Sequence, residues 1–210
     1  MSGPASPILR MSNDARPDPI VVDDVVLIKE ALSGDGEAFA VLVDRHKNTI
    51  FNLCYRMMGN YQDAQDISQE AFLQVWRKLS WFRAGQKFRN WLITIAINLC
   101  RNKLKRDKII RFISIDRTVR TEDGEIPVEV ADATPTPEQL ALGKEWKKRI
   151  NLMVSSLSVK YRPVFLLRYV EGLSYKEISE ITGMPAGTVE TYLFRAKKTI
   201  LKKIEIFFPG

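Results

Sequence analysis

The chain has 210 residues, of which 45% are hydrophobic and 27% charged, a balance typical of soluble globular proteins rather than of largely disordered ones. Its formal net charge of +7 favours polyanionic partners. No apolar run is long enough to cross a bilayer, and the first residues lack the apolar core of a signal peptide, so we expect a cytoplasmic protein without direct membrane insertion.

Charge is distributed in blocks along the chain. Residues 31–120 hold 16 bases and 8 acids, residues 140–210 hold 13 bases and 6 acids, and residues 121–139 hold six acids and no base. Residues 1–22 are rich in Pro, Ser and Asp without periodicity, which predicts a disordered tail. We therefore predict two basic domains, at 23–112 and 137–207, joined by a flexible acidic linker at 113–136.

Apolar residues recur at helical intervals in the first of these domains and predict four helices. Their expected ranges are 25–32, 37–57, 62–79 and 88–108. Within these helices, Cys54 and Cys100 lie in apolar contexts, which predicts two buried thiols, with a redox pair as the alternative. Because His46 is the single histidine, we predict no metal site and no cofactor.

The third predicted helix presents two faces. Ile67, Ala71, Val75 and Leu79 form an inward face at helical spacing, and the other side carries Asp66, Gln69, Glu70 and Leu73. Carboxylates and an amide around an apolar residue suit docking on a helical partner, although a solvated acidic face is the alternative. Asp63 and Asp66 could suggest metal ligands, but no third ligand converges on them, so we interpret them as acids at a helix start.

Aromatic and basic residues alternate around the fourth predicted helix, in WFRAGQKFRNWLITIAINLCRNKLKR. Aromatic rings stack on exposed bases while cations follow phosphates, at about 1 to 3 kcal/mol per stacked base. The loop from Arg83 to Arg89 could hold a base turned out of the duplex. The alternative is an aromatic core with a basic outer face, and Trp91 fits either interpretation.

The C-terminal domain is predicted to be helical throughout. Helices are expected from Thr136 to about Met153 and from Tyr161 to Val170. In SYKEISEITGMPAGTVETYLFRAKKTIL, Ser174 and Glu177 form a capping box and Gly183 permits a turn. A second helix follows, with a buried stripe of Val189, Leu193 and Ile200. This pattern predicts a helix-turn-helix, whose second helix can enter a major groove, although a helical hairpin with a solvated charged face is the alternative.

Three blocks together carry a family resemblance. DISQEAFLQVWRKLSWF, FRNWLITIAINLCRNKL and YRPVFLLRYVEGLSYKEISEITGMPAGTVETYLFRAKK resemble, in order and spacing, the extracytoplasmic-function (ECF) group of bacterial sigma-70 family factors. The resemblance implies an all-α chain with two helical domains, sigma regions 2 and 4, and a linker in place of a middle domain. It also implies a non-enzymatic factor that directs RNA polymerase to promoters and has no small-molecule substrate.

The resemblance assigns roles to individual residues. It implies that Asp66, Gln69 and Glu70 dock on a coiled coil of the largest subunit of core RNA polymerase. Leu73, the apolar residue of the same face, is predicted to bind there with them. It implies that nine recognise and help to melt the minus-ten element: Arg83, Lys87, Phe88, Arg89, Trp91, Asn98, Arg101, Asn102 and Lys105. Seven would read the minus-thirty-five element: Thr188, Glu190, Thr191, Tyr192, Phe194, Arg195 and Lys198. The acidic linker would enter the polymerase cleft, and an anti-sigma factor, often membrane-bound in this group, is an expected partner.

Some residues depart from the family pattern, and rival functions remain. Glu190 stands where a base is common and Tyr192 where arginine is common, so the minus-thirty-five sequence cannot be copied from relatives. The rivals are an operator-binding regulator independent of polymerase, a nucleic-acid enzyme, and an adaptor that binds polymerase without DNA. The enzyme would need paired metal carboxylates or a nucleophile with a base, and the sequence shows neither.

Overall fold

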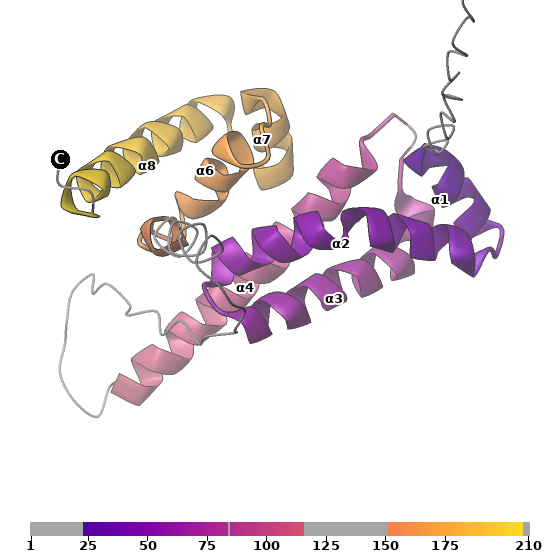
Figure 1. The fold of residues 1–210 in the computed structure, drawn as a ribbon, viewed down its shortest axis with the longest axis horizontal. Helices are drawn as coiled ribbons and strands as arrows, with labels where there is room; N and C mark the ends of the chain where they lie inside the picture. The colour runs from indigo at the N-terminus through magenta and orange to yellow at the C-terminus, as the bar shows by residue number, and fades with distance from the viewer. Residues whose placement is uncertain (1–22, 84, 116–150, 208–210) are drawn as a thin grey trace, which may run out of the picture.

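The computed structural model describes residues 23–83, 85–115 and 151–207, and these are helical with no strand among them. The all-α prediction is therefore confirmed for the described residues. The elements in chain order are α1 (Asp24–Leu32), α2 (Gly36–Met58), α3 (Tyr61–Arg77), the short 3-10 helix η1 (Leu79–Trp81), α4 (Phe88–Ile115), α6 (Arg162–Tyr169), α7 (Tyr175–Thr182) and α8 (Ala186–Phe207). Figure 1 shows their arrangement.

Local signals explain where the helices of the first unit begin and end. Asp23, Asp35 and Asn60 each accept a backbone N–H at the N-cap position of α1, α2 and α3. Gly59 ends α2 in the left-handed region, at φ 82°, where a Cβ would be strained. These short-range contacts explain why the predicted bounds of α1 and α2 differ from the observed ones by only one residue.

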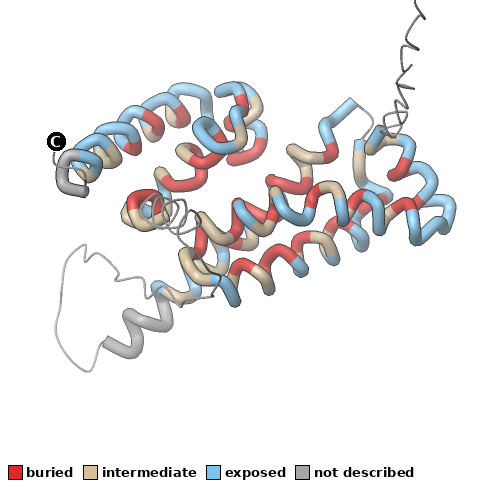
Figure 2. The backbone as a smooth tube through the Cα atoms, in the orientation of Figure 1, coloured by how far each residue is buried: buried red, intermediate tan, exposed pale blue. Residues whose placement is uncertain are grey.

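The first unit is a bundle of α2, α3 and α4, with α1 packed against α2. Its largest fully buried side chains include Leu42, Ile50, Leu53, Leu92 and Ile97. Figure 2 shows the buried stretches of these helices where they face one another. The predicted inward face of α3 is confirmed, since Ile67, Ala71, Val75 and Leu79 are all buried.

A polar contact ties the start of the chain to this bundle. Asp24 pairs with Arg45 and lies 2.8 Å from Nε2 of the buried His46, whose ring also contacts Phe88 at the start of α4. Cys54 and Cys100 are both buried and free, as predicted. A hydrogen bond with Cys54, followed by burial, raises the pKa of the Cys100 thiol.

The second unit contains the predicted helix-turn-helix. The capping box is present at the start of α7: Oγ of Ser174 accepts from the Glu177 N–H, and Glu177 accepts from the Ser174 N–H. Gly183 ends α7 in the left-handed region, at φ 67°. In α8, Val189 and Leu193 are buried as predicted, whereas Ile200 is only half-buried.

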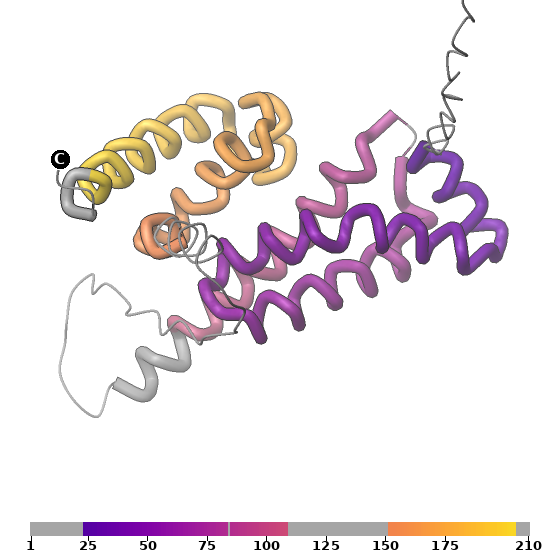
Figure 3. The backbone as a smooth tube through the Cα atoms, viewed as in Figure 1, coloured from indigo at the N-terminus to yellow at the C-terminus, as the bar shows by residue number. Residues whose placement is uncertain are grey.

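The two units pack on one another. α7 lies against α4 and α6 against α2, and buried apolar residues of both units form one continuous core. Figure 3 shows the chain path, with α6 to α8 over one side of the bundle. The predicted domain bounds stay a prediction. α4 runs to Ile115, three residues into the predicted linker. The remainder of the linker, the N-terminal tail and the helix start predicted at Thr136 lie outside the described residues.

Arg162 crosses between the units. It is buried, and its guanidinium donates to the carbonyl oxygens of Met57 at the end of α2 and of Ser155 and Leu157 in its own unit. Burial lowers its pKa to about 10, so the side chain remains cationic at neutral pH. No described helix has the length and apolar composition to cross a membrane.

Candidate polymerase and nucleic-acid interfaces

The outward face of α3 carries the four residues predicted to dock on polymerase. Asp66 and Gln69 are exposed, Glu70 is half-buried, and Leu73 is 49% exposed. Within the face, Asp66 accepts from Gln62 at 3.1 Å and Glu70 accepts from Gln74 at 3.2 Å, while Arg77 lies 3.6 Å from Glu70. The carboxylates are thus held along the helix and remain open to a partner.

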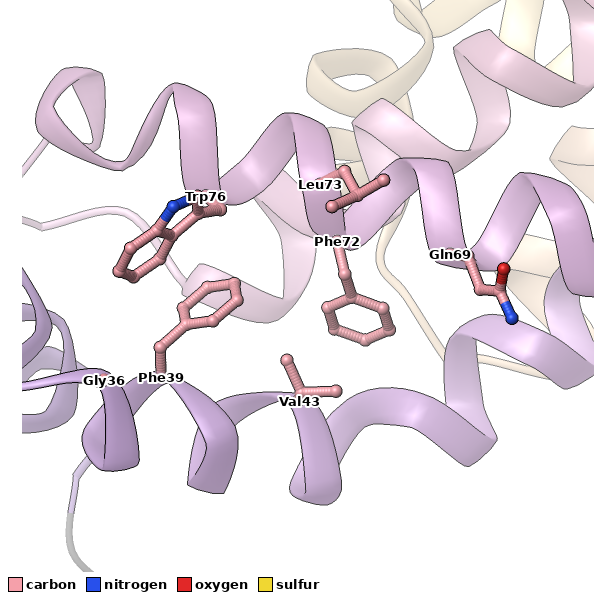
Figure 4. Close-up of a pocket in the computed structure, with 7 residues that line it drawn as sticks. All are labelled: Gly36, Phe39, Val43, Gln69, Phe72, Leu73 and Trp76. Carbon is pink, nitrogen blue, oxygen red and sulfur yellow. The ribbon is translucent and has the colours of Figure 1, made fainter.

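An apolar groove of about 590 Å³ lies beside this face, between α2 and α3. Gly36, Phe39, Val43, Gln69, Phe72, Leu73 and Trp76 line it. In Figure 4 the ring of Phe39 lies beside that of Trp76, and Phe72 points towards Val43. The groove joins Gln69 and Leu73 to residues that sequence reasoning missed. The sequence signal for the groove was the position of Trp76, which is three residues beyond Leu73 and therefore lies on the same side of the helix.

Below the loop that precedes α4, aromatic rings pack on one another. Phe82, Phe88 and Trp91 have ring centroids 5.5 to 6.1 Å apart. Phe88, predicted to contact DNA, is only 3% exposed. Its ring packs against His46, Phe82 and Trp91 and is not available to stack on a base in this structure. Trp91 is half-buried, and the exposed ring here is that of Trp81 in η1, at 75%.

The outer face of α4 brings the predicted polar and basic residues together. Asn98, Asn102 and Lys105 are exposed and Arg101 half-buried, at spacings of three and four that place them along one side. Lys103 belongs to a different side, because its Nζ lies 3.2 Å from Asp63 of α3, which raises the pKa of Lys103. Lys103 is therefore part of the contact between α3 and α4, whereas Lys105, two residues away, faces solvent.

Two cations, one in the loop before α4 and one in its first turn, pair with carboxylates of the second unit. Nζ of Lys87 lies 2.8 Å from Oε1 of Glu177, and Arg89 is paired with Glu171. The contact with Lys87, followed by hydrogen bonds from Ser174, lowers the pKa of Glu177 to about 2. Burial raises the pKa of Glu171 against the opposing effect of Arg89 and Arg56. Arg83 is exposed.

The first turns of α8 hold the residues predicted to read the minus-thirty-five element. Glu190, Thr191, Phe194, Arg195 and Lys198 are exposed, and Phe194 is 70% exposed. Thr188 is half-buried. Tyr192 is also half-buried, its ring meeting that of Tyr161 edge-on, and the Tyr161 hydroxyl accepts from Arg195 at 3.2 Å.

Within the described part of the chain, no group of three or more His, Cys, Asp or Glu side chains is arranged to hold a metal ion. The surfaces that bring the predicted site residues together are the groove beside α3 and the outer faces of α4 and α8. Each is suited to binding a macromolecule.

Comparisons with known proteins assign the chain to a family. The model of sigma-70 region 2 matches residues 42–109, and that of sigma-70 region 4 matches residues 147–200. The ECF RNA polymerase sigma factor SigW of Bacillus subtilis is 34% identical over 177 residues, covering 84% of this chain and 94% of that protein. The chain belongs to the ECF RNA polymerase sigma factors.

Other relatives agree with this assignment. The ECF RNA polymerase sigma-E factor of Escherichia coli K12 is 32% identical over 185 residues, covering 87% of this sigma factor and 94% of the relative. Two solved structures share the fold: CnrH in complex with the cytosolic domain of CnrY (TM-score 0.61, 23% identity, 87% of this chain and 97% of that one), and RpoE in complex with the anti-sigma factor NepR from Bartonella quintana (TM-score 0.60, 20% identity, 80% and 97%). The protein is an alternative sigma factor.

Proposed function

We propose that this sigma factor binds core RNA polymerase through the outer face of α3 and the adjoining groove. The observation that carries the proposal is that Gln69 and Leu73 belong both to the predicted docking face and to the lining of the groove. Charged side chains beside an apolar groove suit an amphipathic helical partner, with apolar anchors in the groove and basic residues near Asp66 and Glu70. A coiled coil of the largest polymerase subunit fits this description.

We propose further that the loop before α4 and the outer face of α4 capture the non-template strand of the minus-ten element. Separating duplex DNA costs about 1.4 kcal/mol per base-pair step, and base stacking on aromatic rings together with phosphate contacts must offset it. Trp91 supplies a ring, and Arg101 and Lys105 supply cations on the same face. Asn98 and Asn102 offer amide groups to base edges.

The start of α8 is proposed to read the minus-thirty-five element in the major groove. Glu190, Thr191 and Phe194 are exposed in the N-terminal half of α8, and the N-terminal residues of a recognition helix are those that contact base edges. Glu190 can accept from a cytosine amino group and Phe194 can meet a thymine methyl. Arg195 and Lys198 are placed for phosphates. No covalent step is assigned to any of these residues.

An anti-sigma factor is the proposed regulator. Two proteins with this fold were solved with such a partner or with a cytosolic domain bound. We propose that this sigma factor acts in the cytoplasm and is sequestered by a protein that covers its docking or DNA-reading faces. Affinity purification from resting and stressed cells checks this, since recovery of polymerase with no other stoichiometric protein in either condition contradicts it.

Run-off transcription tests the proposed function directly. Sigma-free core polymerase is mixed with the purified protein and a genomic DNA library, and the transcript starts are sequenced. We expect starts that share upstream elements about 10 and 35 base pairs away. Start sites identical to those of core polymerase alone would contradict the proposal and would favour a regulator that binds an operator independently of polymerase.

A further inference from the structure

Two cations that are predicted to contact DNA, Lys87 just before α4 and Arg89 in its first turn, are bound to carboxylates of the second unit. Oε1 of Glu177 accepts from Nζ of Lys87 at 2.8 Å and from Nδ2 of Asn90 at 3.3 Å. Arg89 pairs with Glu171, whose side chain is only 6% exposed. These pairs join residues that lie more than 80 positions apart in the chain.

Glu177 serves the two units with different oxygens. Its Oε2 accepts from the backbone N–H of Ser174 at 3.0 Å and from the Ser174 hydroxyl at 2.9 Å, which completes the cap of α7. Its Oε1 is directed to Lys87 and Asn90. Because the cap fixes the side chain, the second oxygen is held at the unit boundary without further loss of side-chain freedom.

A carboxylate in these positions competes with DNA. Ammonium and guanidinium groups bind phosphate oxygens through the same N–H donors that Glu177 and Glu171 now occupy. Distance adds a second conflict. The minus-ten and minus-thirty-five elements lie about 25 base pairs apart, roughly 85 Å of duplex at 3.4 Å per base pair. While the helix-turn-helix contacts the loop that precedes α4 (the minus-ten loop), the two proposed DNA-reading surfaces are too close together to reach both promoter elements at once.

We propose that Glu171 and Glu177 form an intramolecular latch, which in the free protein occupies Lys87, Arg89 and Asn90 and holds the helix-turn-helix against the minus-ten loop. Promoter engagement on core polymerase then requires the latch to open. The inference rests on the proposed function, because it takes Lys87 and Arg89 to be DNA contacts.

The test uses one charge-neutralising variant and a matched control on the same helix. Glu177→Gln removes the charge but keeps an N3 side chain that a capping box accepts. Glu180→Gln removes one charge from an exposed position of α7, three residues away. Glu171→Ala is a second variant that removes the partner of Arg89. Circular dichroism establishes that each variant is folded.

Two measurements are made on the full-length free protein. Fluorescence anisotropy follows binding of a mixed-sequence single-stranded DNA of about 20 nucleotides over a salt series, and small-angle X-ray scattering gives the radius of gyration. We expect Glu177→Gln to bind the DNA at least threefold more tightly than the wild type, with a salt slope steeper by about 0.7 for one added phosphate contact. Its radius of gyration should exceed that of the wild type. Glu180→Gln should match the wild type in each measurement.

A third measurement repeats the DNA binding with core polymerase present, where the advantage of Glu177→Gln should fall below twofold. Equal gains for Glu177→Gln and Glu180→Gln, an unchanged salt slope, or an advantage that persists on core polymerase would each overturn the latch. Failure of the wild type to select start sites in run-off transcription would instead contradict the proposed function. The radius of gyration of Glu177→Gln would still show whether these carboxylates hold the two units together.

Discussion

At the scale of single residues, Arg162 shows how one buried cation can join two units without a carboxylate. It satisfies three carbonyl oxygens, two in its own unit and that of Met57 at the end of α2, while its Nε has no hydrogen-bond partner. The carbonyl end of a helix carries partial negative charge, which favours a cation there. The hydrogen bonds and this attraction offset part of the cost of burying the charge.

We predict that Arg162→Met destabilises the protein by about 1 to 3 kcal/mol, because carbonyl oxygens now bonded to Arg162 lose their donor. Urea denaturation followed by circular dichroism measures the free energy of unfolding. Lys160→Met, an exposed change two residues away, is the control and should have little effect. An Arg162→Met protein as stable as the wild type would show that relief of the desolvation cost outweighs the lost hydrogen bonds.

At the scale of elements, the two sides of α3 have different environments. Its inward side is buried in the bundle, and its outward side adjoins the groove that Phe39 and Val43 of α2 complete. Phe39 and Phe72 of the groove pack against the core, whereas Leu73 is 49% exposed. Leu73 is therefore the apolar residue of this side that can be replaced with little loss of stability.

Leu73→Asp should weaken binding to core polymerase at least tenfold while leaving the melting temperature nearly unchanged. The added carboxylate would have to be desolvated in an apolar interface. Leu201→Asp is a control of matched exposure, since Leu201 is 50% exposed on α8 and Leu73 is 49% exposed. Surface plasmon resonance with immobilised core enzyme measures the affinity, and equal losses for the two variants would contradict the docking assignment.

Lys103 and Lys105 of α4 offer a second comparison between function and structure. Lys105→Ala should slow open-complex formation several-fold and leave stability unchanged, because its side chain faces solvent. Lys103→Ala should instead lower the free energy of unfolding by up to about 1 kcal/mol, because Lys103 pairs with Asp63. Permanganate footprinting of the promoter and thermal melting measure the two effects. The reverse pattern would show that the DNA-facing side of α4 is misassigned.

At the scale of the whole molecule, the continuous core predicts cooperative unfolding. Buried residues of α2, α4, α6 and α7 belong to one cluster, so melting either unit exposes apolar surface of the other. We expect differential scanning calorimetry to show one transition for the full chain in low salt. Two well-separated transitions would indicate that the contact between the units adds little stability.

Much of this architecture could be predicted from the sequence, because it depends on short-range chemistry. The cap of α2 by Asp35, its end at Gly59, and the capping box of Ser174 and Glu177 lie within a few residues of the helix ends they determine. The polar side of α3 and the basic side of α4 follow from helical periodicity alone. The resemblance to sigma factors came from the same segments.

What could not be predicted depends on contacts between distant segments. The groove needs Phe39 of α2 beside Trp76 of α3, and the pairing of Arg89 with Glu171 needs the second unit to fold back on the first. The burial of Phe88 likewise depends on His46 and Phe82. Periodicity gives the side of a helix on which a residue lies but not what covers that side.

The uninterrupted length of α4 has a mechanical consequence. Its 28 residues contain no glycine or proline, so at 1.5 Å per residue the helix is a rod of about 42 Å, close to the length of twelve stacked base pairs. Asn98, Asn102 and Lys105 stay in angular register with the loop at its start only while this rod is unbroken. A proline at the exposed position 102 would kink it and turn the far half away, so that the proposed DNA contacts at its two ends would no longer lie along one side.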